Sequence, residues 1–252
     1  MKLLLDLGNT RLKWAIAAAG GWSARGALAW DGDVPAALVS AWRDLARPDR
    51  VVGASVVDGA READVEKIVA DLFAHDIAWV RTPAEACGVR NAYAEPQRLG
   101  ADRFLAMVAA HAAGHAPCVL AGIGTALTLD ALSADGGHLG GLIAPGPLLM
   151  QQSLLGATAR VRPEHAGVIR DIADNTADAV ASGCWLAVAA LVERFARRIA
   201  EQHAEASVRL LLDGGDAEAL LPLLGVPGEL AADSVLRGLL VWADSHPMPS
   251  SP

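Results

Sequence analysis

The segment from Lys2 to Trp14 reads KLLLDLGNTRLKW, and it decides how the first part of the chain should fold. Residues 2–7 and 11–17 are strand-like and flank a Gly-Asn-Thr turn, which predicts a β-hairpin. Asp6 places a carboxylate near the end of an otherwise aliphatic strand. Such a turn can direct backbone N–H groups and a hydroxyl at a phosphate, and the carboxylate can hold Mg²⁺ through water. An ordinary hairpin, in which Asp6 only hydrogen-bonds the turn, explains this motif equally well.

A second segment repeats the strand–turn–strand pattern in the other half of the chain. Residues 119–132 read VLAGIGTALTLDAL, and Gly124 follows Gly8 by 116 residues. The second turn, Gly122 to Thr125, would be weak evidence by itself, but the two turns support each other. A repeat at this spacing indicates a duplicated domain that binds a ligand between its copies.

Strand-like and helix-like segments alternate along the rest of the chain, which predicts an α/β fold of mixed sheets flanked by helices. In the first half we expect a third strand at 22–28, helices at 34–45, 60–74 and 100–114, and strands at 50–57 and 77–81. In the second half we expect strands at 118–123, 125–132, 136–145 and 208–212, and helices at 147–156, 174–203 and 232–244. The predicted domains are 1–116 and 117–246, with a disordered tail at 247–252.

Composition narrows the class of protein. The 252 residues are 53% hydrophobic and carry a net charge of −8, which suits a globular protein and gives nucleic-acid binding no electrostatic support. Cys87, Cys118 and Cys184 match no zinc pattern and no disulfide framework. No apolar run reaches the roughly 18 residues that a membrane span needs. We therefore expect a soluble protein in a reducing cytoplasm, with no nucleic-acid or membrane partner.

Familiar nucleotide-binding and hydrolase motifs are missing from the sequence. It contains no G-x-x-x-x-G-K-[ST] loop, no G-x-G-x-x-G after the first strand and no G-x-S-x-G elbow. A nucleotide site in this chain would therefore have to be built from the two hairpins.

The next concentration of polar chemistry runs from Asn91 to Arg103. Tyr93, the only tyrosine, precedes an Asp102-Arg103 pair at a predicted helix N-terminus. One interpretation makes Asp102 an acid favoured by the helix dipole and leaves Arg103 on the surface. The other makes Asp102 a base that accepts a hydroxyl proton and Arg103 a clamp for a substrate carboxylate.

In this order, the motifs resemble those of the type III pantothenate kinases, a branch of the superfold shared by acetate and sugar kinases, heat-shock chaperones and actin. The resemblance spans about residues 1–245. It rests on D-x-G-N-T at Asp6–Thr10, N-x-Y…G-x-D-R at Asn91–Arg103, G-T-A-x-T-x-D at Gly124–Asp130, G-G-x-I-x-P-G at Gly140–Gly146, N-T-x-x-A-x-x-S-G at Asn175–Gly183, G-G-D-A at Gly214–Ala217 and L-R-G-L at Leu236–Leu239.

The resemblance implies duplicated actin-like, ribonuclease H-like domains and ATP-dependent phosphorylation of pantothenate, the first committed step toward coenzyme A. It implies a homodimer, with Asp102 as the catalytic base and Asp6 holding Mg²⁺ through water. ATP phosphates would be bound by Asp6, Gly8, Asn9, Thr10, Arg11, Lys13, Gly124 and Thr125. Pantothenate would be bound by Tyr93, Gly100, Ala101, Asp102, Arg103 and, from the other protomer, Thr176.

Two positions depart from the family pattern. Gly122 stands where the family generally has an aspartate of its monovalent-cation site, so direct coordination of K⁺ or NH₄⁺ is in doubt, although backbone carbonyls or Asp130 could partly substitute. Asp213 replaces a threonine and suggests altered contacts to adenine. Two other functions remain open: another small-molecule kinase or phosphatase of the superfold, and a non-catalytic regulatory homologue.

Overall fold

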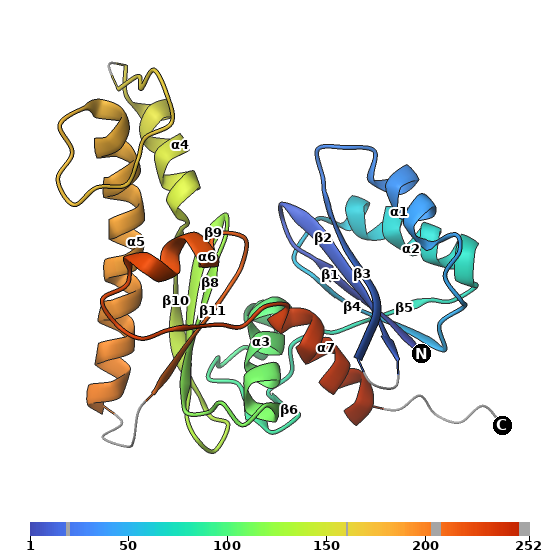
Figure 1. The fold of residues 1–252 in the computed structure, drawn as a ribbon. Coiled ribbons are helices and arrows are strands. Elements are labelled where there is room, and N and C mark those ends of the chain that lie inside the picture. The colour runs from blue at the N-terminus through green and yellow to red at the C-terminus, as the bar shows by residue number, and fades with distance from the viewer. Residues whose placement is uncertain (19–20, 160, 203–207, 247–252) are drawn as a thin grey trace. The chain divides into compact units, whose positions relative to one another are not determined.

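A computed structural model describes residues 1–18, 21–159, 161–202 and 208–246. The chain forms two compact units, one containing Met1–Gly114 with the segment that begins at Ser234, the other containing His115–Asp233. Each unit is a five-stranded sheet with helices beside it (Figure 1). The two units are described below one at a time.

The sheet of unit 1 contains the predicted hairpin and its third strand. Its strand order is β3-β2-β1-β4-β5. The first three strands are antiparallel neighbours, and β4 and β5 continue the sheet in parallel with β1. The strands are β1 (Lys2–Leu7), β2 (Arg11–Ala18), β3 (Gly21–Ala29), β4 (Arg50–Ser55) and β5 (Ile77–Trp79). Leu3 and Leu4 are both fully buried although they point to opposite faces, so β1 is covered on both sides, as its aliphatic run predicts.

Two pairs of helices cover the two faces of this sheet. One face packs with α1 (Val34–Trp42) and α2 (Gly59–Phe73), where the fully buried Trp42 meets Trp14 edge-on at 6.0 Å between ring centroids. The other face packs with α3 (Ala101–Ala112) and α7 (Ser234–Ser245). A Cβ on Gly238 would lie 2.0 Å from the Leu105 carbonyl oxygen, so a glycine is what lets α7 approach α3 this closely.

Three short elements of unit 1 were not predicted from the sequence: β6 (Glu85–Ala86), β7 (Val89–Arg90) and the 3₁₀ turn η1 (Pro96–Arg98). They connect β5 to α3. Strands of two residues leave no hydrophobic periodicity, so the sequence pattern carries no signal for them.

Unit 2 repeats the sheet of unit 1 strand for strand. Its order is β10-β9-β8-β11-β12, again an antiparallel meander followed by two parallel strands. The strands are β8 (Cys118–Ile123), β9 (Ala126–Leu132), β10 (His138–Pro145), β11 (Arg209–Asp213) and β12 (Glu229–Leu230). This shared order confirms the duplicated fold that the two similar hairpins predict.

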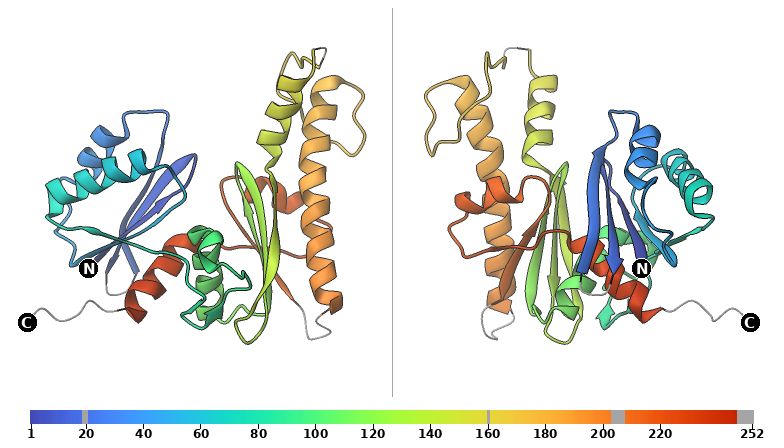
Figure 2. Two further views of the ribbon diagram at one scale, coloured as in Figure 1. Left: turned by 180° about the vertical axis from the view of Figure 1, so that it is seen from behind. Right: turned by 45° about the vertical axis from the view of Figure 1, so that its right-hand side comes forward.

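The helices of unit 2 are α4 (Pro147–Ala157), α5 (Thr176–Gln202) and α6 (Ala217–Leu220), followed by the 3₁₀ turn η2 (Leu221–Leu223). By length and composition α5 could cross a membrane, but the core helix of a soluble protein passes the same test. Figure 2 shows α5 running along the second sheet, and its Trp185, Val188 and Val192 are buried against strand residues there. We therefore treat α5 as the core helix of unit 2.

The last helix, α7, belongs to a different unit from the one predicted. The sequence assigned residues up to 246 to the second domain, whereas the structure groups α7 with unit 1. Leu236 and Leu239 on α7 pack in the same cluster as Leu4 of β1, and Lys2 forms an ion pair with Asp244. The predicted tail at 247–252 lies outside the described residues.

Candidate functional site

The first hairpin turn is closed by its own backbone. The Gly8 N–H donates to the Arg11 carbonyl oxygen at 3.0 Å, so this amide shapes the turn and is not available to a ligand. Asp6 pairs with Lys13 on β2, and both side chains lie on the face that also carries Leu4 and Ala15. An acid and a base therefore stand on neighbouring strands at the end of β1, where the resemblance expects ATP phosphates and Mg²⁺.

Arg103 and Tyr93 form a pair in unit 1. The Arg103 side chain is buried, with its residue only 6% exposed, and its Nη1 donates to the Tyr93 hydroxyl at 3.2 Å. The guanidinium carbon also lies 5.9 Å from the centroid of the Tyr93 ring. Asn91 holds the tyrosine backbone, because its Oδ1 accepts the Tyr93 N–H at 3.0 Å. The alternative that left Arg103 on the surface is therefore wrong.

At the start of α3, a glycine leaves room for the side chain of Asp102. Gly100 is the N-cap residue, and a Cβ there would lie 2.4 Å from Oδ1 of Asp102 in the first helical turn. Thr82 supports this start, since its buried Oγ1 donates to the Leu99 carbonyl oxygen at 2.8 Å. Sequence reasoning missed Thr82, and no pattern around it distinguishes it from other threonines.

The hairpin and the start of α3 share one face of the first sheet. Ala54 is the register partner of Asp6 on β4, and Ala54 and Ala101 belong to the same buried cluster. Ala101 directly precedes Asp102. Two predicted parts of the site, separated by about ninety residues in the sequence, are thus brought to the same face of unit 1.

The second hairpin turn, in unit 2, is surrounded by close backbone contacts. A Cβ on Gly146, at the start of α4, would lie 1.8 Å from the Gly124 carbonyl oxygen, and the Gly146 N–H donates to Thr125 O at 2.8 Å. Gly214 has a φ of +108°, and a Cβ on it would lie 2.1 Å from the Ile123 carbonyl oxygen. The turn at 124–125, the start of α4 and the 213–216 turn therefore meet at the end of β8.

Gly122 occupies the fifth position of β8, as Asp6 does in β1. Its strand partners are Thr128 on β9 and Asp213 on β11. Asp130 is buried and lies 2.9 Å from Nε2 of His138, so its carboxylate already has a partner inside unit 2. This pairing weighs against Asp130 as a substitute cation ligand.

Thr176 is the first residue of α5 and is exposed, and the segment before it is hydrogen-bonded to that helix. Asn175 caps α5, because its Oδ1 accepts the Asp178 N–H at 3.0 Å. The pKa of Asp178 is lowered to about 2, first by the Val168 N–H and then by bonds from Arg170 and Asn175. The arrangement fixes the position of Thr176.

The described residues contain no group of three or more His, Cys, Asp or Glu side chains that could hold a metal ion. This does not conflict with Mg²⁺, which keeps several waters and is usually bound by one or two carboxylates together with substrate phosphates. The exposed position of the hairpin turn and the carboxylate of Asp6 fit an ion of that kind.

Comparisons with known proteins agree on one family. The family model described as Type III pantothenate kinase matches residues 2–198. A protein of that name from Aromatoleum aromaticum is 40% identical over 247 residues, covering 96% of this chain and 98% of the relative. Another, from Xanthomonas campestris pv. campestris strain B100, is 41% identical over 252 residues and covers 98% of each chain.

Solved structures with the same fold are more distant in sequence. A 2-dehydro-3-deoxygalactonokinase candidate from Sinorhizobium meliloti aligns with a TM-score of 0.61 and 13% identity, over 100% of this chain and 99% of its own. Component A of the Acidaminococcus fermentans (R)-2-hydroxyglutaryl-CoA dehydratase aligns with a TM-score of 0.53 and 17% identity, over 95% of each chain. At these identities the likeness concerns the fold alone.

Proposed function

Because this chain belongs to the type III pantothenate kinase family, we propose that it transfers the γ-phosphoryl group of ATP to pantothenate, the first committed step of coenzyme A synthesis. The observation that supports this most directly is the buried Arg103–Tyr93 pair beside the start of α3. A buried arginine with a hydroxyl partner suits a small acidic substrate. Neither a different small-molecule kinase nor a regulatory homologue is favoured by any comparison.

Asp102 is the proposed base. The primary hydroxyl oxygen of pantothenate forms a bond to the γ-phosphorus, the bond from that phosphorus to the bridging oxygen breaks, and ADP leaves. The hydroxyl proton passes to the Asp102 carboxylate. Its place in the first turn of α3 favours the ionised form, because the positive end of the helix dipole lies there. Such a reaction needs mainly positioning and charge neutralisation.

Arg103 and Tyr93 are the proposed pantothenate-binding side chains. The guanidinium would bind the carboxylate of the substrate, and the tyrosine hydroxyl, already bonded to Arg103, would keep it in place. Gly100 and Ala101 would line the same site. Gly100 also leaves room for the Asp102 carboxylate, which a Cβ at that position would displace.

ATP and Mg²⁺ are the proposed co-substrate and metal. Lys13 and Arg11 supply positive charge near the first turn, and Asp6 would hold Mg²⁺ through water. The proposed phosphate-binding set is Asp6, Asn9, Thr10, Arg11, Lys13, Gly124 and Thr125. Gly8 shapes the turn, because its N–H is bonded to the Arg11 carbonyl oxygen. When bound, Mg²⁺ would neutralise charge on the phosphates. We include no carboxylate ligand at position 122 for K⁺ or NH₄⁺, because that residue is glycine.

We also propose that the protein is a homodimer and is located in the cytoplasm. Exposed hydrophobic side chains on β10 and α4 of unit 2, among them Ile143 and Leu148, support a protein interface there. Thr176, exposed at the start of α5, would complete the pantothenate site of the partner. The unpaired thiols of Cys87, Cys118 and Cys184 suit a reducing compartment.

A coupled assay of ADP release, with and without pantothenate, tests this function. We expect pantothenate-dependent turnover in the wild type and a loss of at least about 100-fold in Asp102→Asn, since a general base contributes roughly that much or more. Pantothenate binding by the variant should remain measurable. Asp71→Asn, an exposed change on α2, is the control.

Each alternative function gives a different result in that assay. Absence of turnover in the presence of ATP, Mg²⁺ and either K⁺ or NH₄⁺ would favour a regulatory homologue. ATP turnover that ignores pantothenate but responds to another acceptor would favour a different kinase. Wild-type rates in Asp102→Asn would remove this residue from its role as base.

A further inference from the structure

Two side chains outside the recognised motifs bind the carbonyl groups of the first hairpin turn. Trp30 Nε1 donates to the Gly8 carbonyl oxygen at 2.7 Å, and Arg61 Nη1 donates to the Asn9 carbonyl oxygen at 3.4 Å. The backbone N–H of Trp30 donates to the next carbonyl oxygen, that of Thr10, at 3.3 Å. Three successive carbonyl groups of the turn are therefore held by two residues.

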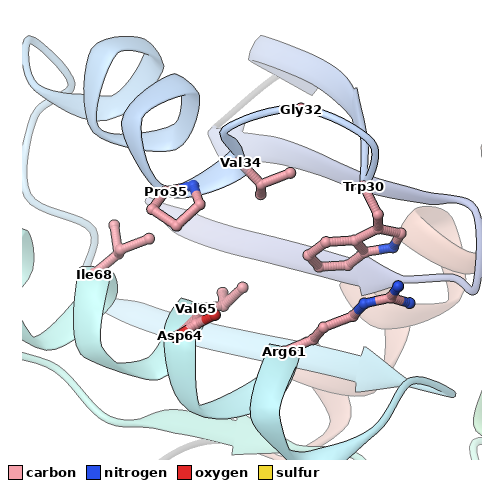
Figure 3. A pocket seen from close by; sticks show the side chains of 8 residues that line it. All are labelled: Trp30, Gly32, Val34, Pro35, Arg61, Asp64, Val65 and Ile68. Carbon is pink, nitrogen blue, oxygen red and sulfur yellow. The ribbon is translucent and has the colours of Figure 1, made fainter.

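Trp30 and Arg61 also hold each other; we refer to them as the Trp30–Arg61 pair. The guanidinium carbon lies 5.0 Å from the centroid of the indole ring, and Figure 3 shows Arg61 extending from α2 toward that ring. Asp58 caps α2 by accepting the Arg61 backbone N–H at 3.1 Å, and its Oδ2 lies 3.9 Å from Arg61 Nε. The pair is thus anchored to the helix start.

The pair reaches the turn from one side of the sheet. Trp30 packs against the cluster that contains Val65 and Ile68 of α2, whereas Leu4 and Ala15 belong to the cluster on the other face. Asp6 and Lys13 share that other face. The pair therefore holds the turn from the side opposite to these two predicted phosphate-site residues.

Because the peptide bond is planar, fixing the direction of a carbonyl group also fixes the direction of the N–H group that follows it. In a planar trans peptide, the C=O of one residue and the N–H of the next point in opposite directions. A Gly8 carbonyl directed at Trp30 therefore directs the Asn9 N–H away from Trp30. A carbonyl of Asn9 directed at Arg61 does the same for the N–H of Thr10. Both amides are therefore turned away from the Trp30–Arg61 pair.

We infer that Trp30, supported by Arg61, is a positioning residue for the ATP phosphates. The inference rests on the proposed kinase function. Holding the carbonyl groups in place prevents the peptide units of a glycine-containing turn from flipping. A flipped unit would present a carbonyl oxygen to the phosphate where an N–H should stand. The hollow beside the pair, about 200 Å³, is smaller than a typical ligand pocket, so the effect is on the turn and not through a ligand of its own.

Trp30→Phe tests this inference because it keeps an aromatic ring and removes the donor. We expect KM for MgATP to rise about tenfold, the loss expected for one hydrogen bond, with KM for pantothenate unchanged. Affinity for inorganic triphosphate should fall by a similar factor, and affinity for adenosine should not change. The thermal midpoint should fall by no more than about 5 °C, the shift expected for loss of one hydrogen bond in a protein of this size.

Trp79→Phe is the matched control. Its indole Nε1 donates to Glu66 Oε1 at 2.6 Å on α2, in the same unit but away from the turn. We expect wild-type KM values for both substrates. Equal effects of the two tryptophan changes, or an unchanged KM for MgATP in Trp30→Phe, would overturn the inference.

Arg61 is tested by comparing Arg61→Met with Arg61→Lys. Lysine retains a charged donor that can reach the turn, so it should keep KM for MgATP closer to wild type than methionine does. Arg47→Met is the control, because Arg47 Nη2 donates to a carbonyl oxygen at the other end of α2, that of Ala74, at 3.3 Å. A methionine variant with wild-type KM for MgATP would remove Arg61 from the inference.

Failure of the inference can be told from failure of the proposed function. If the wild type shows no pantothenate-dependent turnover and no binding of MgATP, the function is wrong. If the wild type is active and the Trp30 and Arg61 variants have the same KM for MgATP as the wild type, the function stands and the positioning role is overturned.

Discussion

The fifth position of the first strand differs in charge between the two hairpins. Asp6 and Gly122 occupy the same strand position in the two units, but only the first carries a carboxylate. A Cβ at Gly122 would lie 2.6 Å from Thr128 Oγ1, so the space beside this glycine is filled by a short polar side chain. The carboxylate on the neighbouring strand, Asp213, accepts a hydrogen bond from the Gly214 N–H at 2.7 Å. Gly122 therefore supplies no anionic ligand to this turn.

This difference predicts weak dependence on monovalent cations. Turnover in K⁺ or NH₄⁺ should resemble turnover in Na⁺ at equal ionic strength, because Gly122 has no carboxylate and Asp130 is already bonded to His138. Initial rates in the chloride salts measure this directly. A strong requirement for K⁺ would show that backbone carbonyls or Asp213 form a cation site without a side chain at 122.

At the scale of an element, α5 is fixed by the chain that precedes it. Asp178, buried in the first turns of this helix, accepts the Val168 N–H and Arg170 Nε, both at 2.8 Å. The Arg170 N–H in turn donates to Ser182 Oγ at 2.9 Å. One carboxylate thereby joins an irregular segment to the helix that presents Thr176.

Asp178 predicts a particular dependence of stability on pH. Its folded-state pKa of about 2 is below the ordinary value, so its contribution is complete above the unfolded pKa near 3.8 and is lost as pH falls toward 2. Asp178→Asn should lower the thermal midpoint by several degrees at neutral pH. The difference from wild type should be constant between about pH 7 and 5 and narrow below about pH 4. A difference that does not change with pH would contradict this role.

At the scale of the whole molecule, exposed hydrophobic residues are unevenly distributed. Among the described residues, the large hydrophobic side chains that are exposed belong to unit 2: Leu139, Leu142, Ile143, Leu148, Leu154, Val168, Ile172 and Leu230. Five of them lie on the edge strand β10 and on α4. Exposed apolar residues on an edge strand and on the helix that follows it in the chain are typical of a surface that another chain covers.

This surface predicts that Ile143→Asp disrupts a dimer. Ile143 is 65% exposed. A charge at this position should therefore leave the fold of unit 2 undisturbed but prevent association. Sedimentation should show a wild-type dimer and a monomeric variant. If Thr176 completes the partner's site, turnover should fall when the dimer is lost. Leu230→Asp, on the opposite edge strand β12, is the control.

Each outcome of that experiment bears on a different part of the dimer proposal. A monomeric wild type would contradict the dimer itself. A dimeric Ile143→Asp variant would move the interface elsewhere, and an active monomer would contradict a shared pantothenate site.

Much of this protein could be predicted from local sequence patterns. Alternating apolar residues and turn residues locate the hairpins, since strand period and turn chemistry act over a few neighbouring residues. The ordered motifs predict the family, which the comparisons confirm. Predicted boundaries differ from the structure by a few residues at most for the long helices, such as 100–114 against Ala101–Ala112.

Only the tertiary structure decided the remaining features. The burial of Arg103, the place of α7 in unit 1 and the attachment of the hairpin turn to Trp30 and Arg61 all depend on contacts between distant segments. Sequence periodicity reports which face of an element is apolar, not which other element will cover it. The sequence by itself therefore determined the two hairpins and the family, and the packing of helices on the sheets decided which atoms hold the predicted site residues in position.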